Sequence, residues 1–291
     1  MAKVLILGGT GMLGGAVLKE FSGFDGALLV SSRAGQILSS DKAIQQVVFD
    51  AKSDSISDVL ISLGAGDYVI NCIGVIKTEI DERSGASKQN AIDVNAVFPR
   101  KLAAEAETRS IRVIQIATDC AFSGRTGHYS ETSRHDATDH YGITKSQGEV
   151  SSVSMMHLRV SIIGPETRGH TSLYDWVSHQ PRDSQITGYI NHRWNGIPSK
   201  HFGKLARGIV ESGTFAAGVH HVIPQDEVTK CELVTLIAQH SGRSDIEITP
   251  GLAREALDRT LVTNNPDFNR NLWANAGYPT PPSIADLVAE I

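Results

Sequence analysis

Short, apolar, β-branched runs alternate with longer segments of helical periodicity through the first 165 residues, and this alternation limits the possible folds most. The runs are nearly continuous in apolar character, as is typical of strands buried on both faces of a parallel sheet. The order strand, helix, strand predicts an α/β fold of the Rossmann type, with a doubly wound parallel sheet. The predicted strands are Val4–Leu7, Ala27–Ser31, Gln46–Phe49, Tyr68–Ile73, Arg112–Ala117 and Met156–Ile163, with helices over Met12–Phe21 and Ile92–Thr108.

A glycine-rich loop follows the first predicted strand. Gly8, Gly11 and Gly14 recur every third residue, a spacing that differs by one residue from the G-x-G-x-x-G pattern of many dehydrogenases. Gly8 permits a tight turn, Gly11 lets the backbone approach a pyrophosphate, and Gly14 allows the helix to pack closely on the strand. The N-terminus of that helix would direct free N–H groups at the anion. A plain strand-to-helix turn is the alternative to the dinucleotide site we predict. The expected contacts are Gly8, Thr10, Gly11, Met12, Leu13 and Gly14.

The end of the second predicted strand bears on which dinucleotide binds. An NAD-preferring site usually places Asp or Glu there to hold the ribose 2′-hydroxyl. This chain has Ser31, Ser32 and Arg33, whose hydroxyls and guanidinium suit a 2′-phosphate. We therefore expect NADP(H) to be preferred and NAD(H) to remain usable, with a solvated surface arginine as the alternative role for Arg33. The further expected cofactor contacts, at the ends of strands three and four, are Asp50, Ala51, Cys72, Ile73 and Gly74.

Beyond Gly164-Pro165 the elements become shorter and are broken by Gly, Pro, Asn and His. We expect residues 1–165 to form the NADP(H)-binding domain, rejoined by about 191–224. Residues 166–190 and 225–291 would form a small, irregular C-terminal substrate-binding domain. The elements predicted in this half are helices over Ser199–Val210 and Lys230–His240, a strand over Val219–Ile223, and a last short helix capped by Ser283.

Tyr141 and Lys145 lie four residues apart, so on a helix they share one face. A neighbouring ammonium lowers the pKa of a phenol and suits it to proton transfer at the end of a hydride transfer. Tyr-x-x-x-Lys also arises by chance, but here it follows the fifth strand of a chain that opens with a glycine loop. Thr118 ends that strand, at the edge where α/β sheets bind ligands. Its hydroxyl can stabilise charge that develops on a substrate carbonyl.

Together these residues resemble the extended short-chain dehydrogenase/reductases. One branch, the dTDP-4-dehydrorhamnose reductases, reads S-T-D-Y-V-F-x-G, then G-x-Y-x-E, then Y-G-x-(T/S)-K-x-x-G-E. The chain is similar over Ala117–Gly124, Gly127–Glu131 and Tyr141–Glu149, and Asp93–Ala96 resembles the family's V-N helix. The resemblance covers about the first 165 residues.

The resemblance implies an NADPH hydride delivered to the C4 carbonyl of a nucleotide-linked 4-keto-6-deoxysugar, in deoxysugar or polysaccharide biosynthesis. It implies that Tyr141 protonates the nascent alkoxide and that Thr118 polarises the carbonyl. Lys145 would hold the nicotinamide ribose and tune Tyr141, so both side chains would also contact the cofactor. Asn95 would help to organise the active site and would contact the cofactor.

Two departures from the family pattern concern the substrate. Ala117 replaces a serine, and Cys120 replaces the tyrosine beside the sugar. Related 4,6-dehydratases need a glutamate at that second position, which makes the dehydratase interpretation weak. Bifunctional epimerase/reductases carry a cysteine there as an acid/base, so that activity stays an alternative, as does a thiol that merely fills space. A non-catalytic, cofactor-binding regulatory subunit is a third possibility.

Residues 151–210 hold seven Lys and Arg against three acidic residues, and some of these cations could bind the phosphates of a nucleotide sugar. Ordinary solvated surface charges are an equal alternative. Trp194 and Asn195 together offer an aromatic plane and an amide, which suit a sugar or a base, although Trp194 could equally belong to the core. The expected substrate contacts are Asp119, Cys120, Arg168, Trp194 and Asn195.

Composition excludes several other classes of protein. The 291 residues carry a net charge of −5 and no Lys/Arg tract, which argues against nucleic acid as the main partner. The three cysteines are widely spaced and predict a reducing compartment, the cytoplasm. No apolar run approaches the ~18 residues of a membrane span, and the N-terminus leaves no room for a signal peptide. The histidines show no metal-ligand spacing, so we expect no bound metal. A homodimer is a further expectation.

Overall fold

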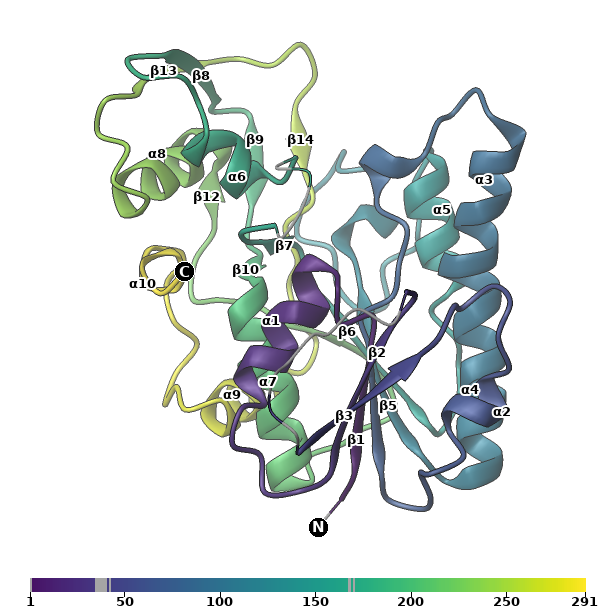
Figure 1. The fold of residues 1–291 in the computed structure, drawn as a ribbon. Coiled ribbons are helices and arrows are strands. Elements are labelled where there is room, and N and C mark those ends of the chain that lie inside the picture. The colour runs from purple at the N-terminus through teal and green to yellow at the C-terminus, as the bar shows by residue number, and fades with distance from the viewer. Residues whose placement is uncertain (1, 35–40, 42, 167–168, 170) are drawn as a thin grey trace.

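The computed structural model describes residues 2–34, 41, 43–166, 169 and 171–291. A seven-stranded sheet lies at its centre, with the strand order β11-β6-β5-β4-β1-β2-β3 and every neighbouring pair parallel (Figure 1). This confirms the predicted Rossmann-type α/β fold. The strands are β1 (Val4–Leu7), β2 (Leu28–Ser32), β3 (Ile44–Val48), β4 (Tyr68–Asn71), β5 (Arg112–Ala117), β6 (Met155–Arg159) and β11 (Gly218–His221).

Helices cover both faces of this sheet (Figure 1). Because side chains alternate along a strand, Val4 and Ile6 enter one apolar cluster while Leu5 and Leu7 enter the other. One face carries α1 (Met12–Glu20), α7 (Ser199–Ser212) and α9 (Pro266–Asn275). The helices on the other side are α2 (Ile56–Val59), α3 (Gly85–Ile92), α4 (Phe98–Arg109) and α5 (His140–Gln147).

The helix predicted over Ser199–Val210 is α7, and it packs against α1. Its inward residues Phe202, Leu205 and Ile209 are fully buried, and so is Val17 of α1. Each such side chain contributes about 1.5–3 kcal/mol by leaving water. A helix from the second half of the chain therefore completes the core of the first half.

Two strand predictions need correction. We expected Gln46–Phe49 to be buried on both faces, but β3 is half exposed because it is the edge strand. We also expected one strand over Met156–Ile163. The chain turns at Val160-Ser161 and divides it into β6 and β7 (Ile162–Ile163), and β7 pairs with β10 (Ile197–Pro198) outside the main sheet.

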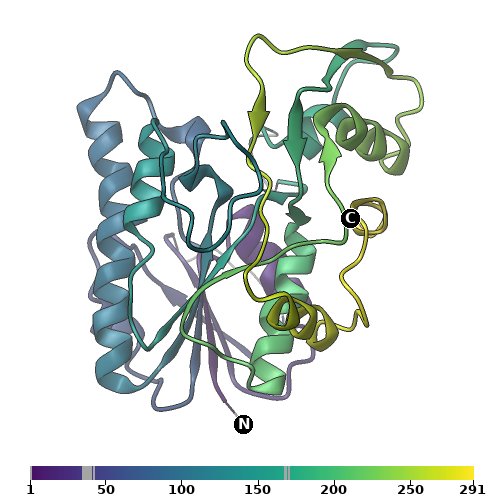
Figure 2. The same cartoon turned by 180° about the vertical axis from the view of Figure 1, so that it is seen from behind.

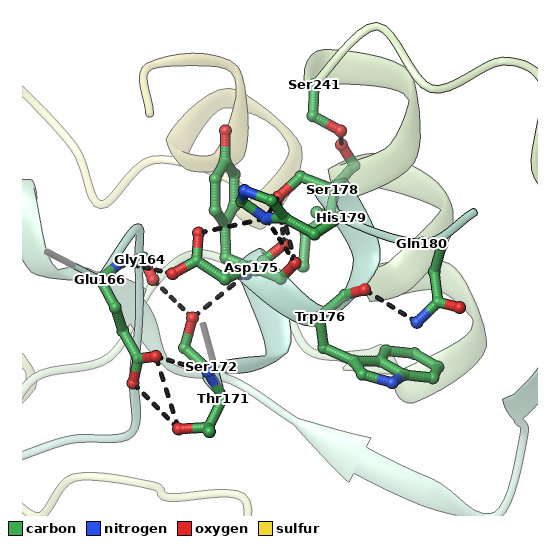
Figure 3. A network of polar contacts seen from close by, with 12 residues as sticks. Gly164, Glu166, Thr171, Ser172, Asp175, Trp176, Ser178, His179, Gln180 and Ser241 are labelled. Atoms are coloured by element: carbon green, nitrogen blue, oxygen red, sulfur yellow. Dashed lines mark hydrogen bonds and ion pairs between the residues drawn. The ribbon is translucent and has the colours of Figure 1, made fainter. Parts of the chain in front are cut away.

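The C-terminal lobe has its own apolar cluster, around Val177, Leu233 and Ile237. It lies above one side of the sheet (Figure 1). Polar contacts attach its first helix to the preceding chain (Figure 3). The backbone N–H of Glu166 donates a hydrogen bond to Asp175, and the Ser172 hydroxyl donates one to the carbonyl oxygen of Gly164. The division into two domains stays a prediction. The elements of the lobe are α6 (Leu173–Ser178), α8 (Lys230–His240), α10 (Ile284–Ala289), β8 (Gln185–Tyr189), β9 (His192–Trp194), β12 (Val228–Thr229), β13 (Glu247–Gly251) and β14 (Leu257–Asp258).

Residues 257–264, here called the crossing segment, run from the lobe back along the sheet towards α9 (Figure 2). Backbone hydrogen bonds join Tyr129 to Thr260 and Val262. The Asn195 side-chain amide both donates to and accepts from the backbone of Leu261. The Glu131 carboxylate accepts from Thr263 and from the next backbone N–H. The path of this segment is therefore fixed by residues far away in the sequence.

A buried arginine lies where β6, β11 and the crossing segment meet. Arg159 is 1% exposed and pairs with the buried Glu149. It also donates to Nε2 of His135 (2.8 Å) and of His221 (2.7 Å), so both rings carry their proton on Nδ1. His221 Nδ1 lies 2.6 Å from the carbonyl oxygen of Val262. Burial, helped by the charge of Arg159, lowers the pKa of His221 to about 4, which keeps the ring neutral at pH 7.

The last helix is attached to α7 through Glu290. Lys204 donates to this carboxylate at 2.7 Å and Tyr278 at 2.8 Å. Burial opposes ionisation, but these hydrogen bonds outweigh it and lower the pKa of Glu290 to about 2. A carboxyl whose pKa is depressed in the folded state stabilises the fold above its unfolded pKa, and this contribution is lost as the pH falls through the folded value.

Replacing Glu290 with glutamine is expected to lower the Tm at pH 7. The difference from the wild type should shrink as the pH falls from about 5 towards 2, where the native carboxyl also becomes neutral. Thermal unfolding of both proteins across this range measures it. Glu211→Gln, at a more exposed pair with Arg207, is the matched control and should change Tm little. A Tm difference that is constant with pH would contradict the assignment.

None of the helices in the described ranges combines the length and apolar character that a membrane crossing requires.

Candidate active site

The predicted site residues converge at the carboxyl ends of β1, β4 and β5. The strand order reverses between β1 and β4, the position at which doubly wound sheets bind ligands. Gly8 follows β1, Cys72 follows β4 and Thr118 follows β5. The sequence placed these residues at three separate strand ends, and the sheet brings those ends to one edge.

The glycine loop has the shape of a dinucleotide cradle. Gly8 has φ = +85°, a conformation that other residues rarely adopt. A Cβ on Gly14 would lie 2.2 Å from the carbonyl oxygen of Gly8, so any side chain there would push α1 off the loop. The Ser31 hydroxyl accepts from the backbone N–H of Gly8, and the Ser31 carbonyl accepts from Gly9. The loop and the N-terminus of α1 therefore fit a pyrophosphate.

The residues expected near the adenosine end are close to this loop. Ser31 is buried and its hydroxyl is used to hold the loop, which the sequence did not reveal. Ser32 is also buried, while Arg33 is exposed. Asp50 accepts a hydrogen bond from the backbone of Lys52, and its own backbone N–H donates to another carboxylate. Arg33 is thus an exposed cation that follows β2 at this end of the cradle.

Tyr141 and Lys145 share one face of α5. Asp139 caps this helix by accepting from the backbone N–H of Gly142 at 2.8 Å, and it pairs with Lys77 at 2.7 Å. Lys145 is buried and donates from Nζ to the carbonyl oxygen of Ile116 at 3.0 Å. Burial lowers the pKa of Lys145 to about 8, although the nearby Glu149 carboxylate opposes that change. The ammonium is thus held beside the end of β5.

Thr118 and Tyr141, the predicted carbonyl-binding group and the predicted acid, lie close to each other. The sequence led us to expect a lowered pKa for Tyr141, but its pKa is raised: burial is the main cause, the Cys120 thiol adds to it, and an interaction with the Thr118 hydroxyl opposes it. The Thr118 hydroxyl donates to Asp119 at 3.2 Å and accepts from the backbone N–H of Cys120. Its single proton must turn from Asp119 to a substrate carbonyl if Thr118 is to polarise one.

Asn95 lies on a turn of π-helix, Asp93–Val97, between α3 and α4. Its side chain accepts from the backbone N–H of Val75 and donates to the carbonyl of the same residue, both at 2.9 Å. It also donates to Thr144 of α5. Turns of π-helix often occur at functional sites. Here the turn orients Asn95 so that its side chain connects the loop after β4 to α5, the helix that carries Tyr141.

Two cations that the sequence did not suggest face Asp119 and Cys120. Arg259 Nη1 lies 3.9 Å from Cys120 Sγ, and the charges of Arg259 and Lys230 both act on Asp119. Burial still raises the pKa of Asp119 and raises that of Cys120 to about 12, so the thiol is protonated at neutral pH. Lys230 and Arg259 are isolated in the sequence, and no motif could have found them.

The remaining predicted substrate residues have other surroundings. Trp194 is buried, donates to Ser161, and has the Lys230 ammonium 5.4 Å from its ring centre. The side-chain amide of Asn195 is hydrogen-bonded to the backbone of the crossing segment. Arg168 lies outside the described residues. Several cations of 151–210 are held by carboxylates of this chain: Arg159 by Glu149, Arg193 by Glu227, Lys204 by Glu290 and Arg207 by Glu211.

No group of three or more His, Cys, Asp and Glu side chains that could hold a metal ion occurs within the described residues.

The model of the RmlD substrate binding domain family matches residues 2–164. The chain belongs to this family. Its membership confirms the resemblance to the dTDP-4-dehydrorhamnose reductase branch of the extended short-chain dehydrogenase/reductases, a class of NAD(P)-dependent enzymes. A search of curated proteins finds no match.

Solved structures share the fold of this RmlD-family chain over its whole length at low identity. A dTDP-4-dehydrorhamnose reductase from Clostridium acetobutylicum is 16% identical with a TM-score of 0.70, covering 99% of this chain and 97% of that one. The Bacillus anthracis reductase in complex with NADP is 16% identical with a TM-score of 0.71, covering 100% and 98%. MoeE5 in complex with UDP-glucuronic acid and NAD is 16% identical with a TM-score of 0.75, covering 99% and 97%.

Proposed function

We propose that this protein reduces the 4-keto group of a nucleotide-linked sugar, with NADPH as the reductant. The observation that carries the proposal is the convergence of Thr118, Tyr141 and Lys145 beside the glycine cradle. The resemblance to the reductases implies a 4-keto-6-deoxysugar. Because the three cysteines are unpaired, we expect the reaction to take place in the cytoplasm. We also expect the protein to be a homodimer.

The side chains divide the reaction among them. Thr118 donates a hydrogen bond to the carbonyl oxygen and stabilises the charge that develops there. Tyr141 gives that oxygen its proton, and Lys145 supplies the positive charge that keeps the proton transfer favourable. When bound, the reduced nicotinamide supplies the hydride. The cradle at Gly8 and Gly14 and the exposed Arg33 support binding of a dinucleotide with a 2′-phosphate.

The test is a screen of dTDP-, UDP-, GDP- and CDP-linked 4-ketosugars for substrate-dependent oxidation of NADPH. We expect one nucleotide series to be reduced at the 4-keto group, with NADH turned over more slowly than NADPH. Failure to oxidise either cofactor with any member of the panel, by protein that binds NADPH, would refute the proposed activity.

The rate of ketoreduction should depend on the charge of Lys145. Because burial lowers the pKa of this ammonium to about 8, kcat/KM is expected to fall as the pH rises through about 8. An arginine at this position stays protonated, so Lys145→Arg should reduce the rate but remove this decline. A pH profile of kcat/KM for both proteins measures the effect. An identical decline in both would show that another group is titrating.

An epimerase/reductase activity through Cys120 is the second candidate. The thiol is protonated, lies near Tyr141, and has the Arg259 guanidinium 3.9 Å from its sulfur, which would stabilise a thiolate. Such an enzyme would exchange a ring proton next to the ketone. Deuterium entering that position from D₂O, and lost in Cys120→Ser, would favour epimerisation; reduction without exchange would exclude it.

A further inference from the structure

Lys230 and Arg259 bring two positive charges from the C-terminal lobe to residues 118–120, which follow β5. Their charges act on Asp119, which directly follows Thr118. Arg259 also reaches Cys120, whose thiol in turn acts on Tyr141. Both cations therefore lie within a side chain's reach of the groups that would act on the substrate carbonyl.

The fold holds each cation in place. Lys230 begins α8, where Thr229 and Glu232 form a capping box, and its ammonium lies over the ring of Trp194. Arg259 belongs to the crossing segment and donates from Nε to the carbonyl oxygen of Phe122 at 2.8 Å. The neighbouring Thr260 bonds to Asp258 through both its backbone and its hydroxyl. These two side chains are thus parts of a built site and not loose surface charges.

The local charges do not balance. Within the described residues, neither Lys230 nor Arg259 has a carboxylate oxygen within ion-pair distance, although the charge of Asp119 acts on both. Arg259 also acts on Asp139, but Lys77 already pairs with that carboxylate. Even with Asp119 ionised, two cations against one anion leave a positive charge that a carboxylate would neutralise. Burial lowers the pKa of Lys230 to about 8, so an incoming anion would also offset the cost of keeping this ammonium charged.

We propose that Lys230 and Arg259 bind a carboxylate carried by the sugar, on a ring carbon next to the one that is reduced, as in a nucleotide-linked hexuronate. The inference rests on the proposed 4-ketoreduction. It differs from the substrate that the resemblance implies, a 6-deoxysugar, only in the substituent on that ring carbon. The resemblance to those reductases implies a tyrosine where this chain has the smaller Cys120, and Arg259 Nη1 lies 3.9 Å from the Cys120 sulfur. A diphosphate would bring at least two negative charges, at the far side of the ring from C4.

UDP-glucose and UDP-glucuronic acid provide a matched pair of probes, since they differ only in having a hydroxymethyl group or a carboxylate. The stable 4-hydroxyl forms are used because a 4-keto hexuronate is a β-keto acid and loses CO₂. The full-length protein, loaded with NADP⁺, is titrated with each by calorimetry to obtain Kd, and the initial rate of NADPH formation is measured separately. In this direction C4 loses a hydride to NADP⁺, and Tyr141, as the phenolate, takes the hydroxyl proton. The corresponding dTDP pair is run in parallel.

The carboxylate form is expected to bind about tenfold or more tightly than its neutral partner, as charge-assisted hydrogen bonds would give. Arg259→Met and Lys230→Met should each remove most of this preference while changing Kd for the neutral sugar nucleotide by less than about twofold. Lys230→Arg should largely retain the preference. Arg254→Met, an exposed arginine of the same lobe, is the control and should change neither Kd. Unchanged thermal unfolding shows that each variant is folded.

Three results would overturn the inference. Equal loss of affinity for both members of a pair would place the cations on the diphosphate. No preference for the carboxylate in the wild type would show that no carboxylate site exists, and so would a preference that survives both substitutions. If neutral 4-ketosugars are nevertheless reduced, the proposed function stands without this site. If no sugar nucleotide is turned over in either direction, the proposed function is refuted, whatever the binding preference.

Discussion

Replacing Tyr141 with phenylalanine is expected to lower kcat for 4-ketoreduction by about 10²- to 10⁴-fold, the range that a positioned general acid contributes. The variant keeps the ring and its packing on α5, but it has no proton to give to the carbonyl oxygen. Steady-state assays on the best substrate of the screen measure the loss. Binding of NADPH, followed by fluorescence, should change little, because the glycine cradle and Lys145 are untouched.

Tyr189→Phe is the matched control for this experiment. Tyr189 ends β8, is exposed, and lies in the C-terminal lobe. Its hydroxyl has no part in the proposed reaction, so its removal should leave kcat unchanged. Full activity in Tyr141→Phe would mean that another group protonates the alkoxide, and the role of α5 would have to be reassigned.

Replacing Arg159 with methionine is expected to destabilise the protein by about 3–5 kcal/mol, because Glu149 would be left as an unpaired buried charge. Both side chains of the pair are nearly inaccessible to water, so solvent cannot compensate the loss. His135 and His221 would lose their donor at the same time. Urea denaturation followed by circular dichroism measures the free energy of unfolding.

The double variant Arg159→Met, Glu149→Gln separates charge from packing. Removing the carboxylate as well should recover a substantial part of the lost stability, since the buried charge is gone. Additive losses in the double variant would instead show that the arginine matters for its volume, and for its stacking on Phe122, and not for the ion pair.

The elements that the sequence predicted best are those specified locally. The helix over Lys230–His240 is α8 with the same bounds, because Thr229 and Glu232 mark its start within the sequence itself. Ser283 caps the last helix as expected. The glycine loop was recognisable for the same reason: its spacing encodes a turn, a close approach and a helix start over seven residues.

What the sequence could not predict depends on long-range contacts. The cations of 151–210 looked available for a substrate, but distant partners such as Glu290 and Glu149 hold several of them. Arg259 gained its place beside Cys120 only because the crossing segment passes there. That path is set by Asn195, which the sequence suggested for the sugar and the fold uses to fix backbone. Contacts between residues so far apart cannot be predicted from a single sequence.

The return of the chain to the sheet has a practical consequence for protein engineering. β6 is covered at its outer edge by β11, and α1 by α7, although both partners come from beyond residue 190. A fragment cut at residue 164, where the family match ends, would expose an unpaired parallel edge and the apolar groove that receives Phe202 and Leu205. Such a truncation should aggregate during expression. We therefore do not expect residues 2–164, which the family model matches, to be a unit that can be expressed, swapped or crystallised by itself.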